Sequence, residues 1–358
     1  MCPKTLNTVD KGDAVMFGRM MNNYYYGKSG KGDFRKEDLP QNRRQLFTDT
    51  LKTRLSALCR LNLLYMLIFL PAMIVIMYFF TSTLSVTSNY MMIEQSENYA
   101  SYVEKLTEAE EEARITEEQY GLIKQQGINF DNMLDDNLFR MLIWLIPCIA
   151  ITGPFTAGLS YVTRNWARDE HAFIWTDFKD AIKENWKQSL ILSVITSLLP
   201  VIVYTGWKFY GQMAGQNMIM IIPQVLVVLV ALIWSISITY MHPLAVTYEL
   251  KTKDVIRNGL LLGVARLPMS VGIRLLHCVP ALVGAALIYF WNPMIGMMIL
   301  FCWYALIGFS LSRFITASYT NAVFDRFINP RIEGAKVNQG LYKQDDEEEE
   351  NEEGETND

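Results

Sequence analysis

Five stretches of this chain carry no Asp, Glu, Lys or Arg, and each is long enough to enter a lipid bilayer: residues 61–93, 141–163, 188–207, 209–248 and 275–312. A helix needs roughly 20 mainly apolar residues to cross the hydrocarbon core, at about 1.5 Å per residue. A chain with several such stretches, and with 51% hydrophobic residues overall, is predicted to be all-α and to cross the membrane repeatedly.

The longest stretches exceed one membrane crossing and must be divided. Residues 275–312 would form a helix about 57 Å long, whereas the hydrocarbon core is about 30 Å thick. Residues 291–293, Trp-Asn-Pro, predict a turn, because proline ends a helix and the residue before it avoids the α conformation. Residues 211–217 hold two glycines and predict another turn. We therefore predict a bundle of about six transmembrane helices in three hairpins, near residues 61–81, 141–162, 189–207, 218–240, 275–290 and 294–312.

The distribution of basic residues predicts the orientation of the chain. The first 60 residues hold 12 Lys and Arg against 6 Asp and Glu, whereas residues 94–139 hold 12 acids and three bases. Lys and Arg near span ends are enriched on the cytoplasmic side, so we expect both termini in the cytoplasm and residues 94–139 outside. We expect no cleaved signal peptide, so the first span would act as an uncleaved anchor.

These assignments divide the chain into three regions. Residues 1–60 are the predicted cytoplasmic N-terminal segment, and residues 61–330 are the transmembrane bundle. Residues 331–358 are a predicted disordered acidic cytoplasmic tail, because residues 345–358 hold ten acids and no base, and so dense a run of like charges repels itself.

The bundle includes an extracytoplasmic acidic helical insertion at residues 82–140. One helical stripe of it is apolar, which predicts an amphipathic helix, and Gly121 or Gly127 would break that helix. The stripe consists of Tyr99, Tyr102, Val103, Leu106, Ala109 and Ala113. A solvated lobe over the bundle and a docking site for an extracellular protein both fit this pattern.

Two motifs near the middle of the chain resemble a known family. Gly153 begins the sequence G-P-F-T-A-G-L-S-Y, and Asp177 begins D-F-K-D-A-I-K-E-N-W-K-Q. The patterns G-P-x-x-x-G-L-x-Y and D-F-x-x-x-x-K-x-N-[FW]-K-Q are similar to those of the YesL-like family of bacterial integral membrane proteins, a domain of unknown function. Residues 16–19 and 61–71 resemble it too, whereas the insertion at residues 82–140 departs from it.

The resemblance implies a location and a class of partner, but no catalytic residue. It implies the plasma membrane of a Gram-positive bacterium and an association with carbohydrate uptake by ATP-driven (ABC) importers. Subunits of such an importer are therefore the expected protein partners, together with the lipid bilayer itself.

A second feature of the same passage is an aromatic stripe at helical spacing within a cytoplasmic amphipathic helix, residues 164–188. Trp175, Phe178, Ile182 and Trp186 recur every three or four residues, so they share one face of that helix, and charged residues occupy the rest. Tryptophans beside a membrane span favour the interface. The stripe predicts either a helix that lies on the inner leaflet or a coupling surface for a cytosolic partner.

Prolines interrupt the three outgoing spans at Pro71, Pro200 and Pro280. A proline kink frees a backbone carbonyl, which can line a cavity as in transporters with broken helices. Proline is also common in membrane helices that form no cavity, because neighbouring groups satisfy the carbonyl. Both interpretations stay open for these three candidate kinks.

Motifs for catalysis, metals and nucleotides find little support. The five cysteines form no CxxC pair, and the three histidines share no metal-ligand spacing. Gly27-Lys28-Ser29 lacks the earlier glycine of a phosphate-binding loop, because Asn22 stands in its place. We therefore expect a protein that is not an enzyme, without cofactor, metal, nucleotide or nucleic-acid partner.

Two functions remain as hypotheses. The first is a non-enzymatic accessory or regulatory partner of a carbohydrate ABC importer. The alternative is a carrier or channel for a small neutral solute such as a sugar, because uncharged polar side chains in the spans could form a polar seam, although such residues commonly just bridge helices. Coupled carriers place an ionisable residue at membrane depth, and here only Arg274 or His277 could reach inward.

Overall fold

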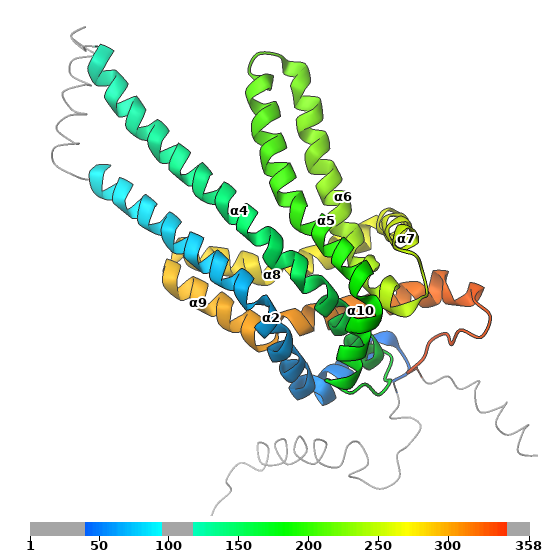
Figure 1. Cartoon of the computed structure of the whole chain (residues 1–358). Helices are drawn as coiled ribbons and strands as arrows, with labels where there is room; N and C mark the ends of the chain where they lie inside the picture. The colour runs from blue at the N-terminus through cyan, green and yellow to red at the C-terminus, as the bar shows by residue number, and fades with distance from the viewer. Residues whose placement is uncertain (1–39, 95–116, 342–358) are drawn as a thin grey trace, which may run out of the picture. The chain divides into compact units, whose positions relative to one another are not determined.

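The computed structural model describes residues 40–94 and 117–341, and within these ranges the chain is helical without strands (Figure 1). Six helices in the described part are long and apolar enough to cross a membrane: Arg43–Ser88, Asn129–Ala167, Thr176–Ala214, Met218–Thr247, Leu267–Phe290 and Pro293–Arg331. The prediction of an all-α, multi-pass membrane protein is confirmed. The apolar stripe at residues 99–113, the Gly27 motif and residues 342–358 of the predicted tail lie outside the described residues.

The helices are longer than the predicted spans. In chain order the elements are α2 (Arg43–Glu94), α4 (Glu117–Ala167), α5 (Thr176–Ala214), η3 (Met218–Met220), α6 (Ile221–Thr247), α7 (Thr252–Ala265), α8 (Leu267–Phe290), α9 (Pro293–Trp303), the π-helical turn η4 (Tyr304–Gly308), α10 (Phe309–Phe327) and η5 (Asn329–Arg331). The extension of α2 at residues 43–60 is rich in Leu and Arg, which favour helix, so charge ends a span without ending its helix.

Two local predictions need correction. The break at Gly121 or Gly127 is wrong, because α4 runs from Glu117 to Ala167 without interruption. An interior glycine costs about 1 kcal/mol, which a long helix absorbs. The separate helix at residues 164–188 is also wrong in its bounds, since α4 ends at Ala167 and α5 begins at Thr176 and continues into the span.

Asparagines form the two turns at helix ends. Asn217 Oδ1 accepts the backbone N–H of Ile219 at 3.1 Å, and Asn292 Oδ1 accepts those of Met294 and Ile295 at 3.0 and 3.1 Å. These bonds satisfy amide groups that have no partner within the first helical turn. Pro293 occupies the first position of α9, where its missing N–H is tolerated. The predicted turn at residues 291–293 is thus confirmed.

The chain forms two compact units, each discontinuous in sequence. The terminal unit comprises Met1–Leu64, Gly158–Asp180 and Pro280–Asp358, and the central unit comprises Tyr65–Ala157 and Ala181–Val279. These limits differ from the predicted boundaries at residues 60 and 330, because long helices such as α2 and α4 contribute part of their length to each unit.

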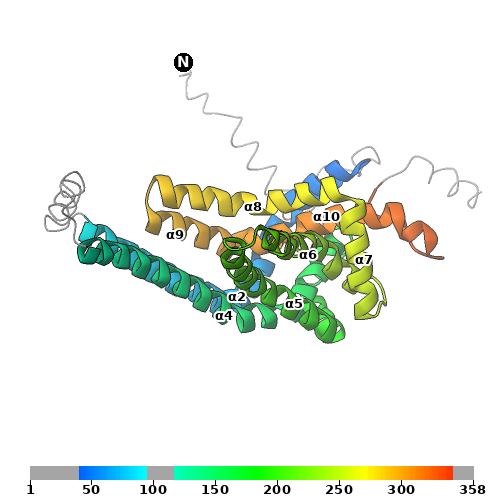
Figure 2. The same ribbon diagram turned by 90° about the horizontal axis from the view of Figure 1, so that it is seen from above.

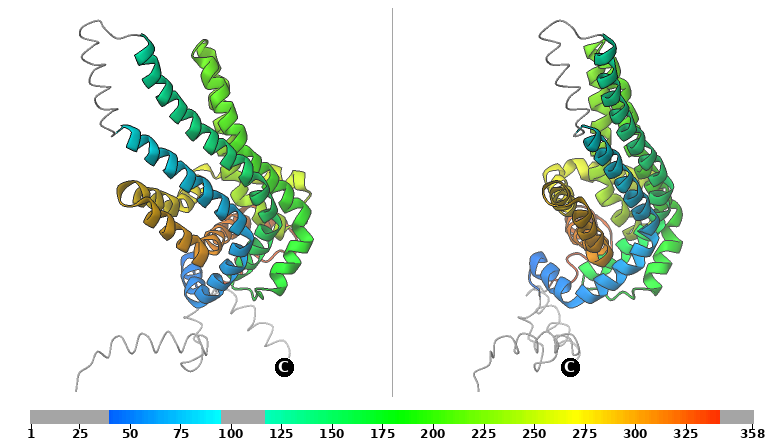
Figure 3. Two further views of the ribbon diagram at one scale, coloured as in Figure 1. Left: turned by 60° about the vertical axis from the view of Figure 1, so that its left-hand side comes forward. Right: turned by 90° about the vertical axis from the view of Figure 1, so that its left-hand side faces the viewer.

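In the central unit, neighbouring helices run antiparallel and meet through polar contacts as well as apolar packing. Helices α2 and α4 are joined by Tyr65 Oη and Thr156 Oγ1 at 2.8 Å, and by Asn137 Nδ2, which donates to Thr83 Oγ1 at 2.7 Å. The indole Nε1 of Trp234 on α6 donates to Thr196 Oγ1 on α5 at 3.0 Å. Figures 1 and 3 show α5 and α6 side by side.

In the terminal unit, the start of α2 packs on α10, and Phe47 stacks on Phe314 with ring centroids 5.1 Å apart. Figure 2 shows the end of α8 lying beside α9, where Gly284 faces Leu300. The buried Asn62 on α2 donates to the carbonyls of Tyr304 and Ala305 at 2.8 and 2.7 Å. A π-turn leaves carbonyls without their usual helical partners, and Asn62 satisfies two of them.

Candidate functional site

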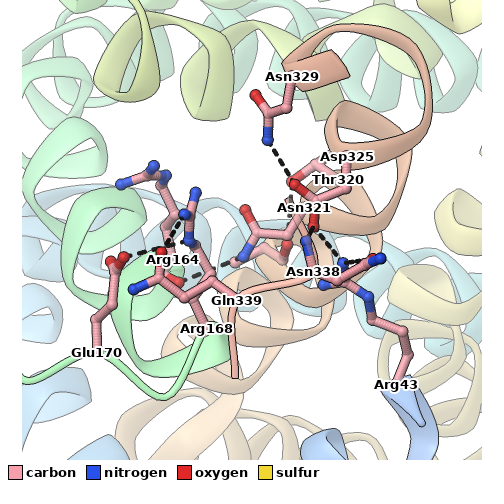
Figure 4. A network of polar contacts seen from close by, with 11 residues as sticks. Arg43, Arg164, Arg168, Glu170, Thr320, Asn321, Asp325, Asn329, Asn338 and Gln339 are labelled. Carbon is pink, nitrogen blue, oxygen red and sulfur yellow. Dashed lines mark hydrogen bonds and ion pairs between the residues drawn. The ribbon is translucent and has the colours of Figure 1, made fainter. Parts of the chain in front are cut away.

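The terminal unit contains a polar cluster centred on Asp325 of α10 (Figure 4). The Asp325 carboxylate forms an ion pair with Arg43, the first residue of α2. It also accepts hydrogen bonds from Asn329 Nδ2 and, at 3.2 Å, from the backbone N–H of Asn338. Arg43 in turn donates to Asn338 Oδ1 at 3.0 Å. Asp325 is only 8% exposed, so these donors replace the water that an isolated carboxylate would need.

A second set of contacts joins the end of α4 to the same region (Figure 4). Arg168 donates through Nη2 to Gln339 Oε1 at 2.7 Å, and its Nε lies 3.3 Å from Glu170 Oε1. Gly340 has a φ of +81°, and a Cβ there would lie 2.7 Å from the Arg168 carbonyl oxygen, so only glycine fits without strain.

These contacts correct the predicted start of the disordered tail. The sequence predicts disorder from residue 331 onward, but the contacts of Asn338, Gln339 and Gly340 hold residues 338–340 on α4 and α10. The argument from acidic repulsion concerns residues 345–358, whereas Asn338 and Gln339 form specific hydrogen bonds that composition does not predict.

The contacts of the polar cluster are structural, and the cluster acts as a brace that holds neighbouring segments together. Both Asp325 oxygens already accept hydrogen bonds or an ion pair, so neither is available as a general base. The cluster ties four segments of the terminal unit together: the start of α2, the end of α4, α10 and residues 338–340. Among the described residues, no three His, Cys, Asp or Glu side chains are grouped as a metal ion would require.

The connection between α4 and α5, residues 168–175, is held in place by this brace. Trp166 Nε1 donates to the Ala172 carbonyl at 3.3 Å, and the Phe173 backbone N–H donates to Asp177 Oδ2 at 2.8 Å. Ala172 is buried. Together with the Arg168 contacts, these bonds fix the connection at both ends and in its middle.

The same connection exposes aromatic side chains. Phe173 is 63% exposed and Trp175 is 64% exposed. The His171 ring lies edge-on to Phe173, with centroids 4.5 Å apart. We call residues 168–175 the aromatic connection. It combines a hydrogen-bonded backbone with two large aromatic side chains that are mostly exposed within the described chain.

The predicted aromatic stripe does not form one uniform face. Phe178 is buried, and Gly158 allows its close approach, because a Cβ at Gly158 would lie 2.7 Å from the Phe178 carbonyl oxygen. Ile182 is half-buried, whereas Trp175 and Trp186 are exposed. The coupling or interfacial role of the four residues stays a prediction.

The other predicted positions lie inside helices. Pro71, Pro200 and Pro280 lie within α2, α5 and α8, and their role as kinks stays a prediction. Asn62, Thr196 and Gln224 are three of the uncharged polar side chains that could form the predicted polar seam, and they bridge helices instead. Asn62 bonds the π-turn, Thr196 accepts from Trp234, and Gln224 Nε2 donates to the Trp207 carbonyl at 3.2 Å. These polar side chains therefore give no support to a polar pathway through the bundle, and the carrier or channel hypothesis stays a prediction.

Asp325 was not predicted from the sequence as a candidate site residue, although the sequence around it is unusual. It is the only acidic residue between Asp254 and Glu333, in a region that otherwise carries only basic charges. A lone acid among arginines is a candidate for a buried ion pair. Its partner, Arg43, lies so far away in sequence that no local pattern could identify it.

Comparison with known proteins reaches only part of the chain. A family model described as "Protein of unknown function, DUF624" matches residues 136–207, which run from α4 through the aromatic connection into α5. Searches of curated proteins and of solved structures give no match. The chain is thus similar, over residues 136–207, to a family whose function is uncharacterised, and the finer resemblance to YesL-like proteins stays a prediction.

Proposed function

We propose that this integral membrane protein is a non-enzymatic partner of a carbohydrate ABC importer, and that it docks through the aromatic connection. The observation that carries the proposal is the combination of a braced backbone with the exposed Phe173 and Trp175. Ordering a loop costs about 1 to 2 kcal/mol per residue in backbone entropy. A connection that is ordered and still exposes aromatics is suited to contact with another surface, since Trp and Phe are enriched at interfaces.

The class of partner comes from the family resemblance, and the side of the membrane comes from charge. Arg164 lies shortly before the aromatic connection and Arg168 is its first residue, which favours the cytoplasmic side. In the proposed arrangement the six spans form three hairpins in the plasma membrane, with both termini in the cytoplasm. The saturated Asp325 carboxylate supports a structural role for the polar cluster, and with it a non-enzymatic function.

Affinity capture from native membranes tests the partnership. Cells grown on an inducing sugar should yield importer subunits with the tagged wild-type protein. The double variant Phe173→Ala/Trp175→Ala should recover at least fivefold less of them. Trp207→Ala is the matched control, because Trp207 is also exposed, at 52%, but lies far along α5. Failure of the wild-type protein to capture any importer subunit would refute the proposal.

Thiol labelling tests the orientation. In a variant that lacks the five native cysteines, an impermeant reagent added to intact cells should label Gln216→Cys but not Glu184→Cys. Both positions are exposed, so burial does not decide the outcome. Labelling of Glu184→Cys from outside would place the start of α5 on the wrong side for a cytoplasmic docking surface.

A further inference from the structure

Helix α7 (Thr252–Ala265) joins two candidate membrane spans through very short connections (Figure 1). Only residues 248–251 separate it from the span Met218–Thr247, and only Arg266 separates it from the span Leu267–Phe290. Each end of α7 is therefore tied to the end of a span, so the helix as a whole stays close to the membrane surface at which those spans end.

Two glycines fix α7 against the last part of α6. A Cβ at Gly259 would lie 2.5 Å from the Met241 side chain, and a Cβ at Gly263 would lie 2.7 Å from Ser237 Oγ, so only glycine allows this close approach. The sequence predicts that the span within α6 ends near residue 240. The contacts with residues 237 and 241 thus place α7 beside the end of that span.

A hydrogen bond from α5 gives the same level independently. Gln188 Nε2 donates to the carbonyl of Leu250, directly before α7, at 2.9 Å. Gln188 is the first residue of the uncharged stretch 188–207, and Lys187 precedes it. All these residues belong to the central unit. The start of α7 therefore lies where the charged part of α5 gives way to its apolar part, which is the level expected for a membrane surface.

The face of α7 that is turned away from α6 changes character along its length. Lys253 and Arg257, one helical turn apart, are exposed near its start. Leu261 and Val264 lie on the same face near its end, and each is 58% exposed. Leu267, exposed at the start of α8, continues the apolar half. The face thus offers positive charge and, one turn further on, apolar surface.

Two acids lie near these bases. Glu249 is exposed before the start of α7, and Asp254 is half-buried in its first turn, where the helix dipole stabilises an acid. With Lys251, residues 249–257 carry three bases and two acids. The outward row that begins with Lys253 and Arg257 holds no acid, so the exposed face of the helix is positive.

A phospholipid with an anionic headgroup matches both halves of this face. Its phosphate accepts hydrogen bonds from Lys and Arg, and its acyl chains begin close to that phosphate. Leu261 follows Arg257 by four residues, about 6 Å along the helix, so one lipid molecule can contact both. An acidic soluble protein would have to enter the bilayer edge to cover Leu261 and Val264, and a phosphate ion would leave both uncovered.

We propose that α7 is an interfacial helix that binds an anionic phospholipid through Lys253 and Arg257, with Leu261 and Val264 among the acyl chains. Amphipathic helices with basic and apolar side chains bind membrane surfaces in this way. The cytoplasmic leaflet, on the side proposed above for these basic residues, is the anionic one. The inference concerns lipid and does not depend on the importer partnership.

Lipid retention, counted by native mass spectrometry, tests the proposal. The full-length protein is reconstituted in vesicles of equal parts phosphatidylcholine and phosphatidylglycerol, and is then extracted in mild detergent. The wild-type protein should retain phosphatidylglycerol over phosphatidylcholine by at least fivefold. Lys251→Gln/Lys253→Gln/Arg257→Gln should lower that ratio at least fivefold, because a single Lys or Arg near an anionic surface contributes about that factor.

Two further variants separate charge from site. Lys179→Gln/Lys183→Gln/Lys187→Gln removes the same charge from exposed positions of α5 and should keep the ratio within twofold of the wild type. Leu261→Ser/Val264→Ser keeps the three bases of α7 but loses apolar contact with acyl chains, so it should lower phosphatidylglycerol retention at least twofold. Unchanged helicity and a monodisperse elution profile exclude misfolding of each variant.

Four results would overturn the proposal. Equal ratios in the wild type and the α7 triple variant would mean that α7 selects no anionic lipid, and an equal loss in the α5 control would indicate a general effect of net charge. Displacement of phosphatidylglycerol by inorganic phosphate at matched ionic strength would identify a soluble anion as the ligand. Full retention by Leu261→Ser/Val264→Ser would favour an acidic protein surface instead.

Discussion

Asp325 of the terminal unit and Arg274 of the central unit are both charged side chains that are at least partly buried, and they differ in the partners that surround them. Asp325 receives a guanidinium, an amide side chain and a backbone N–H. Arg274 Nε donates one hydrogen bond, to Ser235 Oγ at 2.8 Å. A buried charge that is fully paired stabilises the arrangement around it, whereas a charge with a neutral partner retains most of its desolvation penalty.

The comparison separates a structural brace from a charged side chain that has one neutral hydrogen-bond partner. Removing Asp325 would leave Arg43 and the Asn338 amide without their acceptor, so the penalty falls on the fold. Removing Arg274 would leave only a serine hydroxyl, which can rebond to its own helix. Loss of the Asp325 side chain should therefore lower the stability of the fold, whereas loss of the Arg274 side chain should leave stability unchanged or raise it.

The largest effect is expected from Asp325→Ala. It breaks a buried, hydrogen-bonded ion pair, for which the loss is about 3 kcal/mol, near the low end of the usual range because the Arg43 side chain is 26% exposed. Unfolding in mixed detergent and dodecyl sulfate micelles measures it. Asp136→Ala is the control, since its ion pair with Arg140 is solvent-exposed and should contribute under about 0.5 kcal/mol. A change below that value at Asp325 would contradict its role as a brace.

The next effect concerns the packing that positions the aromatic connection. Gly158→Ala places a methyl group 2.7 Å from the Phe178 carbonyl oxygen, and we expect a loss of about 2 kcal/mol from this overpacking. Gly272→Ala is the matched control, because nothing lies within 4 Å of its Cβ and alanine favours helix. The same unfolding assay applies. Equal stability of the two variants would show that α4 and α5 separate easily at Gly158.

A smaller effect is expected at the π-turn. Asn62→Leu removes the donors to the Tyr304 and Ala305 carbonyls and the acceptor for the Ser310 N–H. Because interhelical hydrogen bonds in membranes contribute modestly, the loss should be about 1 kcal/mol. Thr81→Ala serves as the control, since its hydroxyl bonds only carbonyls of its own helix. A loss no greater than that of the control would mean that the π-turn holds without α2.

Sequence predicted the features that depend on local composition. The six apolar helices and the turn before Pro293 follow from the absence of charge and from proline chemistry, and the structure has both. Helix α7 was missed because its charged start, Lys253 and Asp254, resembles an ordinary cytoplasmic loop, while Val255 is buried. The positions of charged residues predict where a membrane span ends, but they do not predict where the helix itself ends.

The candidate site was less predictable, because its contacts join distant parts of the chain. The aromatic pattern identified Trp175 and Trp186, yet it gave Phe178 the same role, although Phe178 is buried against Gly158. The pairing of Arg43 with Asp325 and that of Arg274 with Ser235 depend on which helices become neighbours. Hydropathy and periodicity describe single elements, so neither pairing could be derived from them.

The smallest change in stability is expected at Arg274, and its sign is the sharpest test of the comparison. Arg274→Met replaces an incompletely paired charge with an apolar side chain of similar length, so the protein should be as stable as the wild type or more stable by up to about 1 kcal/mol. Arg43→Met is the matched substitution in the polar cluster, and it should destabilise the protein because it strips Asp325 of its ion pair. Both variants are measured by the same micelle unfolding assay. If Arg274→Met were as destabilising as Arg43→Met, the guanidinium would already be compensated within the folded chain, and Arg274 would be a second brace. A neutral or stabilising outcome would instead mean that the chain keeps a charge its own fold does not need, as proteins do at sites where stability is given up for function.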